Sequence, residues 1–361
     1  MRIGMPQAGN LHIPFKTMFQ RLDVDYTMPP PISQRTMSLG ARYSPEGSCL
    51  PFKLTLGSII EAAERGADTM LMIGGYGICR LGYYSTVQEQ ILHEMGYNVE
   101  MIKFGVSEHK LSNFLNMIKR FSNNASWLKI ISAFRFGLAK LNALDKLEQR
   151  VQKVRATELT KGTANQLYTR FISQIDAADS YRTLNGVKKD YAVQLNKVAR
   201  DTQVKPLVVG IVGEIYVLLE PFSNLDIEKE LGKLGVEVKR RLFFSEWMKF
   251  SLFLNPLGIS EVSRIHRAAL PYLKRDIGGE GWESVGEKVL HAKDYDGLIH
   301  LAPFTCMPEI VAQNIMQTTK ETIPVLTIIC DEQLAKPGML TRLEAFVDLL
   351  KRKQVKGNNR L

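Results

Sequence analysis

Cysteine is scarce in this chain: the 361 residues include four, and no two of them form a CxxC pair. Secreted proteins stapled by disulfides carry a denser framework, and zinc knuckles place their cysteines in close pairs. The composition therefore argues against both classes. It favours a reducing compartment, and we expect a cytoplasmic protein.

Long apolar runs and targeting segments are lacking as well. The longest apolar stretch, residues 323–330, is far too short to cross a bilayer. Residues 1–6 start directly with a strand-like run and lack the apolar core and cleavage site of a signal peptide. A content of 45% hydrophobic and 23% charged residues fits a globular protein with enough chain for two or more domains. We expect no membrane association.

Proline is absent from residues 107–203, and glycine occurs there three times. Apolar residues recur with helical periodicity over 111–121, 127–156 and 164–198, which predicts three long helices. We interpret residues 106–203 as a helical insertion.

The helical segment is also the basic part of the chain. Residues 106–200 hold 17 Lys and Arg against seven Asp and Glu, an excess equal to the whole net charge of +10. Three interpretations stay open: a solvated or protein-docking surface, a site for an anionic ligand such as a phosphate, and a nucleic-acid surface. Because the segment carries no recognisable nucleic-acid motif, we do not expect nucleic acid as a partner.

The two flanking parts alternate strands with helices. Apolar runs predict strands at 2–5, 23–27, 69–73, 98–102, 206–212, 236–242, 297–301 and 324–329. Periodic stretches predict helices at 13–22, 50–65, 85–95, 225–234, 260–275, 281–292, 308–319 and 341–352, before a frayed polar tail at 353–361. The fold class is α/β, with Rossmann-like, doubly wound parallel sheets in residues 1–105 and 204–361.

The cysteines occupy the ends of predicted strands or the start of a predicted helix. Cys79 follows strand 69–73, Cys306 follows strand 297–301, and Cys330 ends strand 324–329. Cys49 precedes helix 50–65, whose positive end favours a thiolate. Ligands of doubly wound sheets bind outside the carboxyl ends of the strands. Thiolates converging there suit an iron–sulfur cluster or zinc, and a zinc site built from all four cysteines stays an alternative.

Glycine and lysine residues beside the cysteines are candidate cofactor-binding groups. Gly74, Gly75 and Gly77 allow close backbone approach and expose amide donors to sulfide or an anion. Lys53 could pair with a phosphate. A plain glycine turn and a solvated lysine are the competing interpretations.

Three further side chains are candidates for chemistry at the same edge. Arg80 follows Cys79 directly and could balance the charge of a cluster. Tyr83 could line the site, and Glu214, after strand 206–212, could donate a proton. Each also has an ordinary structural interpretation: a helix start, packing against a helix, and a hydrogen-bonded carboxylate.

Several short motifs occur in a fixed order along the chain. They are CLPFK at 49–53, GICRLGYY at 77–84, GEIY at 213–216, EPFSN at 220–224, PFTCMPE at 303–309, DE at 331–332 and TRLEAF at 341–346. In this combination the chain resembles the CoA-substrate-specific enzyme activase-related proteins. These are relatives of the 2-hydroxyacyl-CoA dehydratase and benzoyl-CoA reductase subunits and of the double-cubane cluster proteins. The resemblance covers nearly all of the chain outside the helical segment.

The resemblance implies two Rossmann-like domains and a [4Fe-4S] or larger cluster, held here by Cys49, Cys79 and Cys306. It implies low-potential electrons from a separate ATP-hydrolysing activator of sugar-kinase/actin-like fold, used for reduction or radical dehydration of a small substrate. A homologous subunit is a further implied partner. The chain departs from the dehydratase subunits around its cysteines, so no substrate follows. Cys330 does not match a family ligand, and a non-catalytic electron-relay or scaffold subunit stays the alternative.

Overall fold

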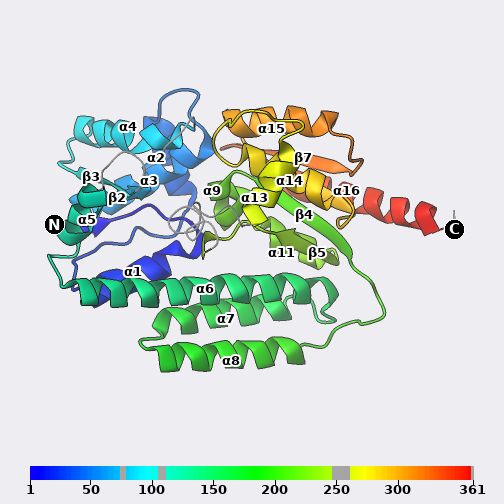
Figure 1. The fold of residues 1–361 in the computed structure, drawn as a ribbon, viewed down its shortest axis with the longest axis horizontal. Coiled ribbons are helices and arrows are strands. Elements are labelled where there is room, and N and C mark those ends of the chain that lie inside the picture. The colour runs from blue at the N-terminus through cyan, green and yellow to red at the C-terminus, as the bar shows by residue number, and fades with distance from the viewer. Residues whose placement is uncertain (74–78, 105–110, 246–260, 359–361) are drawn as a thin grey trace. The chain divides into compact units, whose positions relative to one another are not determined.

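The computed structural model describes residues 1–73, 79–104, 111–245 and 261–358 of a mixed α/β chain. The chain divides into two compact units, Met1–Leu141 and Asn142–Leu361, and the boundary falls within a long helix, α6 (Trp127–Thr157). The division into 1–105, 106–203 and 204–361 stays a prediction. Figure 1 traces the elements.

The first unit is built on a parallel sheet of order β1-β2-β3, with strands Ile3–Gly4, Thr69–Ile73 and Glu100–Phe104. Alternation along β2 sends Met70 and Met72 to one face and Leu71 to the other. Both faces are covered, as a parallel sheet requires. Helices α3 (Leu50–Glu64) and α4 (Leu81–Glu94) contribute to the core on the methionine face. Helices α1 (His12–Arg21) and α5 (Leu111–Phe121) and the start of α6 contribute to the core around Leu71.

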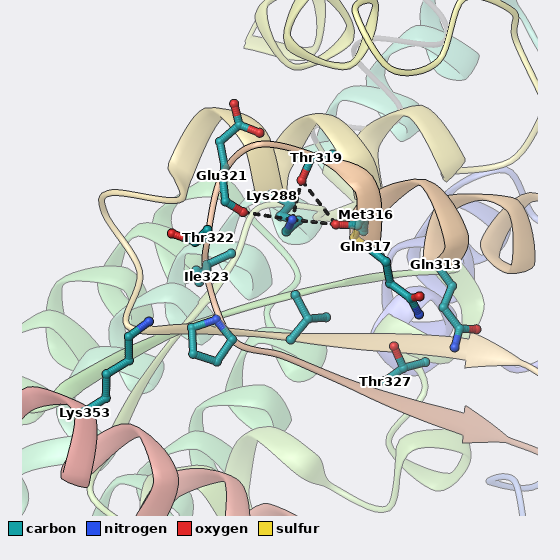
Figure 2. Close-up of a pocket in the computed structure, with 12 residues that line it drawn as sticks. Lys288, Gln313, Met316, Gln317, Thr319, Glu321, Thr322, Ile323, Thr327 and Lys353 are labelled. Atoms are coloured by element: carbon teal, nitrogen blue, oxygen red, sulfur yellow. Dashed lines mark hydrogen bonds between the residues drawn. The ribbon is translucent and has the colours of Figure 1, made fainter.

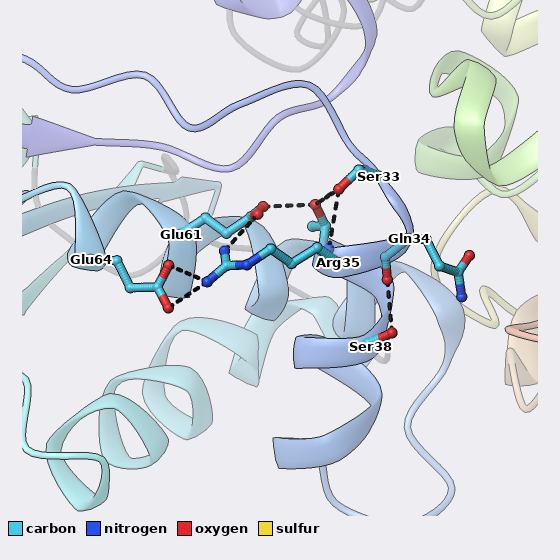
Figure 3. Close-up of polar contacts among 7 residues, drawn as sticks. Ser33, Gln34, Arg35, Ser38, Glu61 and Glu64 are labelled. Atoms are coloured by element: carbon cyan, nitrogen blue, oxygen red, sulfur yellow. Dashed lines mark hydrogen bonds and ion pairs between the residues drawn. The ribbon is translucent and has the colours of Figure 1, made fainter.

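Helix α2 (Gln34–Tyr43), absent from the sequence prediction, packs against α3. Ser33 begins α2 with a capping box, in which the Ser33 and Thr36 side chains exchange bonds with each other's backbone. Arg35 donates to Glu61 at 2.9 Å and to both carboxylate oxygens of Glu64 (Figure 3). Glu61 is 3% exposed and also accepts from the Thr36 hydroxyl at 2.7 Å, so its buried charge is fully paired.

Glycines set how closely α2 approaches α3. A Cβ on Gly57 would lie 1.9 Å from the Thr36 carbonyl oxygen, and one on Gly40 would lie 1.7 Å from that of Lys53. Both contacts are with backbone, which cannot move aside as a flexible side chain does. The two helices therefore pack backbone to backbone, and only glycine fits at either position.

After α6, two helices form a hairpin: α7 (Thr163–Ala177) and α8 (Tyr181–Lys197) lie side by side (Figure 1). The hairpin is closed at its base by an antiparallel bridge between Glu158 and Arg200. The Glu158 carboxylate accepts from the backbone amides of Gly162 and Ala164 at 2.8 and 2.7 Å and so satisfies the start of α7. The chain enters and leaves the hairpin at one place.

The second unit contains an all-parallel sheet of order β5-β4-β6-β7. Its strands are β4 (Leu207–Gly213), β5 (Val236–Arg240), β6 (Gly297–Pro303) and β7 (Val325–Cys330). The connecting helices are α9 (Ile215–Leu219), α10 (Pro221–Asn224), α11 (Ile227–Lys233), α13 (Glu261–Ala269), α14 (Gly281–His291) and α15 (Met307–Thr318), and α16 (Lys336–Asn358) closes the chain. Every residue of β6 is buried, as expected for an inner parallel strand.

A buried charge network holds β5 in this unit. The Arg240 guanidinium pairs with Glu228 of α11 at 2.6 Å and with Glu148 of α6 at 2.9 Å. Arg155 and Gln152 of α6 add further partners for Glu228. These opposite charges lower the pKa of Glu228 against the effect of burial, so Glu228 is ionised and paired.

Several predicted elements were wrong in detail. The strand at 23–27 is reduced to a bridge between Ile3 and Tyr26, although Ile3 still bonds Asp25 and Thr27 through the backbone. The helix at 164–198 is broken, because Ser180 caps α8 with a full capping box. The frayed tail instead continues α16 as far as Asn358.

The helix predicted at 260–275 ends earlier, at Ala269, and the helix predicted at 341–352 begins earlier, at Lys336. Most other predicted elements lie within a few residues of those observed, and strand 69–73 and helix 111–121 agree at both ends. Within the part of the chain described, no helix is long and apolar enough to cross a membrane.

Replacing Gly57 with alanine should destabilise the protein by about 1–3 kcal/mol, because the new methyl group meets the Thr36 carbonyl. Urea unfolding measures the change. The matched control is Gly186→Ala in α8, where the added Cβ meets no described atom within 4 Å. It should stabilise by about 1 kcal/mol through helix propensity. Equal effects of the two variants would contradict the packing described for α2 and α3.

Candidate functional site

The second unit has a topological switch point at the carboxyl edge of its sheet. From β4 the chain crosses to β5 on one side, and it then returns to form β6 on the other side. In doubly wound sheets ligands bind in the crevice outside the carboxyl ends of two such strands. Here those ends are Gly213 of β4 and Pro303 of β6.

Glu214 stands at this point, directly after β4. Gly213 has φ +142°, and a Cβ there would lie 2.0 Å from the Leu301 carbonyl oxygen, so glycine is required. The Glu214 carboxylate caps α9 by accepting from the Val217 amide at 2.9 Å. Burial raises the pKa of Glu214 to about 7, and the nearby Glu309 adds to the shift. A carboxyl with that pKa can exchange a proton near neutral pH.

Cys306 lies on the other side of the switch point, after β6. It is the N-cap of α15, with Pro308 in the first turn, and it makes no capping hydrogen bond through its side chain. Its amide donates to the Pro303 carbonyl at 3.0 Å, and the preceding Thr305 has φ +65°. A cysteine at a helix N-terminus is stabilised as a thiolate. The side chain is 6% exposed, and it lies between the exposed Phe304 and Met307.

Cys330 ends β7, and its side chain is fully buried. Burial raises the pKa of the Cys330 thiol to about 12, and the charges of Asp331 and Glu214 add to the effect. The Phe304 amide donates to the Cys330 carbonyl at 2.8 Å, so Cys330 contacts the Cys306 loop through its backbone. Its environment favours the neutral thiol, unlike a metal-binding thiolate.

In the first unit, Cys49 and Cys79 lie at the starts of neighbouring helices. Cys49 is the N-cap of α3, and Cys79 directly precedes Arg80, the N-cap of α4. The Tyr84 hydroxyl of α4 contacts the Cys49 sulfur, and the Arg80 guanidinium donates to the Gly47 carbonyl at 3.1 Å. The structure therefore brings the segments of Cys49 and Cys79 together.

The remaining predicted residues are distributed as follows. Lys53 is half-buried in the first turn of α3, and Tyr83 is 72% exposed at the start of α4. Gly74, Gly75 and Gly77 lie outside the described residues. Cys49 and Cys79 belong to one unit, Cys306 and Cys330 to the other. Across the described ranges, no three His, Cys, Asp or Glu side chains are grouped so that they would hold a metal ion as they stand.

Sequence reasoning missed a repeated pattern. Cys49 and Cys306 each begin a Cys-x-Pro motif. Pro51 and Pro308 lie in the first turn of α3 and α15, the helices that follow. The repeat was visible in the sequence as CLP and CMP. Sequence reasoning also missed Glu280. No motif surrounds Glu280, and only the fold brings it close to Glu214.

A cavity of about 500 Å³ lies elsewhere in the second unit, at the amino end of β7 (Figure 2). Lys288 lines it and is 4% exposed. Its ammonium group donates to the Met316 and Glu321 carbonyls at 2.6 and 3.1 Å and to the Thr319 hydroxyl. Since three acceptors occupy the three N–H bonds of Lys288, this lysine stabilises the end of α15. The cavity is at the opposite end of β7 from Cys330.

No family model matches the chain, and no curated protein matches it. Its function is therefore inferred from the carboxyl edges of the two sheets.

The thiols should differ in reactivity. Iodoacetamide at pH 8 should alkylate the partly exposed Cys79 at least tenfold faster than Cys330, because Cys330 is buried and its pKa is about 12. Mass spectrometry of the reduced protein under anaerobic conditions gives both rates, and labelling in denaturant shows that all sites can react. Comparable rates in the folded protein would contradict the described burial of Cys330.

Proposed function

We propose that the protein binds an iron–sulfur cluster, [4Fe-4S] or larger, through Cys49, Cys79 and Cys306. It accepts low-potential electrons from a separate ATP-hydrolysing activator and uses them for reduction or radical dehydration of a small substrate. The observation that carries the proposal is the repeated Cys-x-Pro helix start, at Cys49 in one unit and at Cys306 in the other.

The donor chemistry of these cysteines fits the cluster. Iron–sulfur clusters are held by cysteine thiolates. Cys49 and Cys306 stand at helix N-termini without a side-chain cap, where partial positive charge stabilises a thiolate. Cys79 lies one residue before the N-cap of α4. Cys330, with its raised pKa, fits the role of a ligand less well. When bound, such a cluster supplies one-electron transfer.

Neighbouring residues have roles that follow from their positions. Arg80, anchored on the Gly47 carbonyl, places a positive charge beside Cys79 and would offset negative charge there. The exposed Tyr83 is free to meet a substrate, and Glu214 can give up a proton near neutral pH. Lys53 and the backbone of Gly74, Gly75 and Gly77 complete the proposed set.

The fold supports the proposal at the level of architecture. In chain order the strands of the sheet β5-β4-β6-β7 run second, first, third, fourth, which is compatible with the doubly wound sheet that we propose. In the first unit the Tyr26 bridge lies beside β1, on the side away from β2, which repeats this order in reduced form. The chain carries no P-loop motif, so ATP hydrolysis belongs to the activator.

Anaerobic reconstitution with iron and sulfide tests the proposal. The wild-type protein should take up iron and sulfide and show a cluster signal by electron paramagnetic resonance after reduction. Cys49→Ala, Cys79→Ala and Cys306→Ala should each lose most of the iron, because each removes a proposed ligand.

The matched control is Cys330→Ala, which should keep the wild-type iron content. A wild-type protein that takes up no cluster would sink the proposal, as would Cys79→Ala with a full complement. One stable zinc per chain without a brown chromophore would favour a structural zinc site.

A second candidate, a relay or scaffold subunit of the same assembly, is favoured by the charge of α8. Arg182, Lys189 and Lys197 are exposed along this helix. Asp190 is its one acidic residue, and it is engaged by Arg170 of α7 at 3.4 Å. The exposed face is therefore basic and suited to an acidic protein surface.

If α8 docks a partner, Arg182→Glu with Lys189→Glu should weaken anaerobic co-purification of that partner at least tenfold. The effect should shrink at high salt, because such contacts are screened. The matched control is Lys274→Glu, an exposed charge outside the hairpin. Unchanged co-purification in the double variant would remove α8 as the docking surface. Cluster binding is tested separately.

A further inference from the structure

We propose that Glu214, Glu280 and Glu309 form a proton-holding site at the switch point between β4 and β6. In this site Glu214 and Glu280 keep one proton between them at neutral pH. The site is distinct from the thiols and consists of three carboxyl groups from three separate elements.

The first observation is that two of these carboxyls meet the same helical turn. Glu214 accepts from the Val217 amide at 2.9 Å, and Glu280 accepts from the Ile215 amide at 3.4 Å. Because these two amides belong to one turn of α9, the carboxyl groups bound to them are neighbours. Glu214 and Glu280 are 66 residues apart in sequence, so the fold alone creates the pair.

The second observation is the packing that fixes Glu280 beside the start of α15. Glu280 is the N-cap of α14 and lies between Gly279 and Gly281. A Cβ on Gly279 would lie 3.2 Å from a ring carbon of Pro308, and one on Gly281 would lie 3.1 Å from the Pro308 carbonyl oxygen. The loop of Glu280 therefore packs directly on the first turn of α15, the helix that Cys306 begins.

The third observation concerns Glu309, which is fully buried in that first turn. Its Oε2 atom accepts from the Ser284 hydroxyl at 2.8 Å and is hydrogen-bonded to His300 Nε2 at 2.8 Å. Its Oε1 atom is buried and has no hydrogen-bond partner within the described part of the chain. A buried carboxylate oxygen without a donor is costly, so this oxygen calls for a proton or for a donor that arrives with a ligand.

The charges around the three carboxyls favour retention of protons. Among the described residues, no lysine or arginine forms an ion pair with Glu214, Glu280 or Glu309, and the one basic group bonded to any of them is His300. Burial raises the pKa of Glu214 to about 7, and the charge of Glu309 adds to this shift. Burial also raises the pKa of Glu280 well above its usual range, and the charge of Glu214 adds to that shift.

Other titratable groups facing the site do not supply positive charge. Tyr216 of α9 and Cys330 of β7 are neutral at pH 7, since burial raises the pKa of both. Glu283 of α14 adds negative charge towards Glu280 and is itself bonded to His266 at 2.7 Å. Arg342 of α16 donates to the Thr327 carbonyl instead of to a carboxylate.

The pair can release its proton and recover it. On release its charge goes from one negative to two, and solvent can return the proton, because Glu214 and Glu280 are only partly buried. The use of this proton to accompany an electron delivered to a substrate rests on the proposed function. The existence of the proton-holding pair does not rest on the proposed function.

Infrared spectroscopy of the full chain, without added iron, tests the pair. In the wild-type protein a protonated-carboxyl C=O band should persist above pH 6 and disappear as the pH rises further. Glu214→Gln should keep a band from Glu280, and this band should disappear at a lower pH than in the wild type, because a negative neighbour of Glu280 is gone. Glu280→Gln, which keeps an amide oxygen for the Ile215 N–H, should leave only the band of Glu214, and that band should disappear near pH 7.

The matched control is Glu344→Gln, which changes an exposed carboxyl of α16 and should leave the titration of the band within a few tenths of a unit. Absence of the band above pH 6 in the wild-type protein would overturn the proposal without relying on any variant. A band unaltered in both Glu214→Gln and Glu280→Gln would belong to Glu309 and would also overturn it. Reconstituted Glu280→Gln should bind iron as the wild type does, so failure of the pair and failure of the cluster are separate results.

Discussion

Parallel strand direction is the constraint on which the candidate site depends. Parallel strands need crossover connections, and a helix that returns the chain starts at the carboxyl edge of the sheet. Helix N-termini therefore gather at that edge, with their partial positive charge and unpaired N–H groups. Cys306, Glu214 and Glu280 occupy such positions in one unit, and Cys49 does so in the other. Thiol and carboxyl groups thus stand where unpaired backbone N–H groups are available to them.

Strands and most helices could be predicted because their signals are local. Buried runs such as residues 69–73 are apolar throughout, and Gly66 ends α3 with φ +87°. The break at Ser180 was missed because the apolar period continues from α7 into α8, although Ser180 and Thr183 were visible as a capping pair. The local apolar pattern predicts where a helix or strand lies. Its exact ends depend on capping residues, which can end a helix even where the apolar periodicity continues.

The position of a candidate residue was predictable where it ends a strand or directly precedes a helix, as for Cys49, Cys306, Cys330 and Glu214. It was not predictable where the environment comes from packing between distant segments. Glu280 acquires its character from the α9 amides and from Pro308, and Glu309 from Ser284 and His300. In the sequence Glu309 looks like an ordinary acidic residue at the start of a helix. In the structure it is buried by neighbours that no sequence motif indicates.

The closed base of the α7–α8 hairpin has an evolutionary consequence. Leu159 bonds Ala199 and Asp201 bonds Thr157, so residues on both sides of the hairpin are already held together by the backbone. A helical hairpin whose two ends are held together can become longer or shorter, or be lost, without changing the path of the chain on either side of it. The basic helices can therefore change in sequence and length while the parallel sheet and its carboxyl edge stay unchanged.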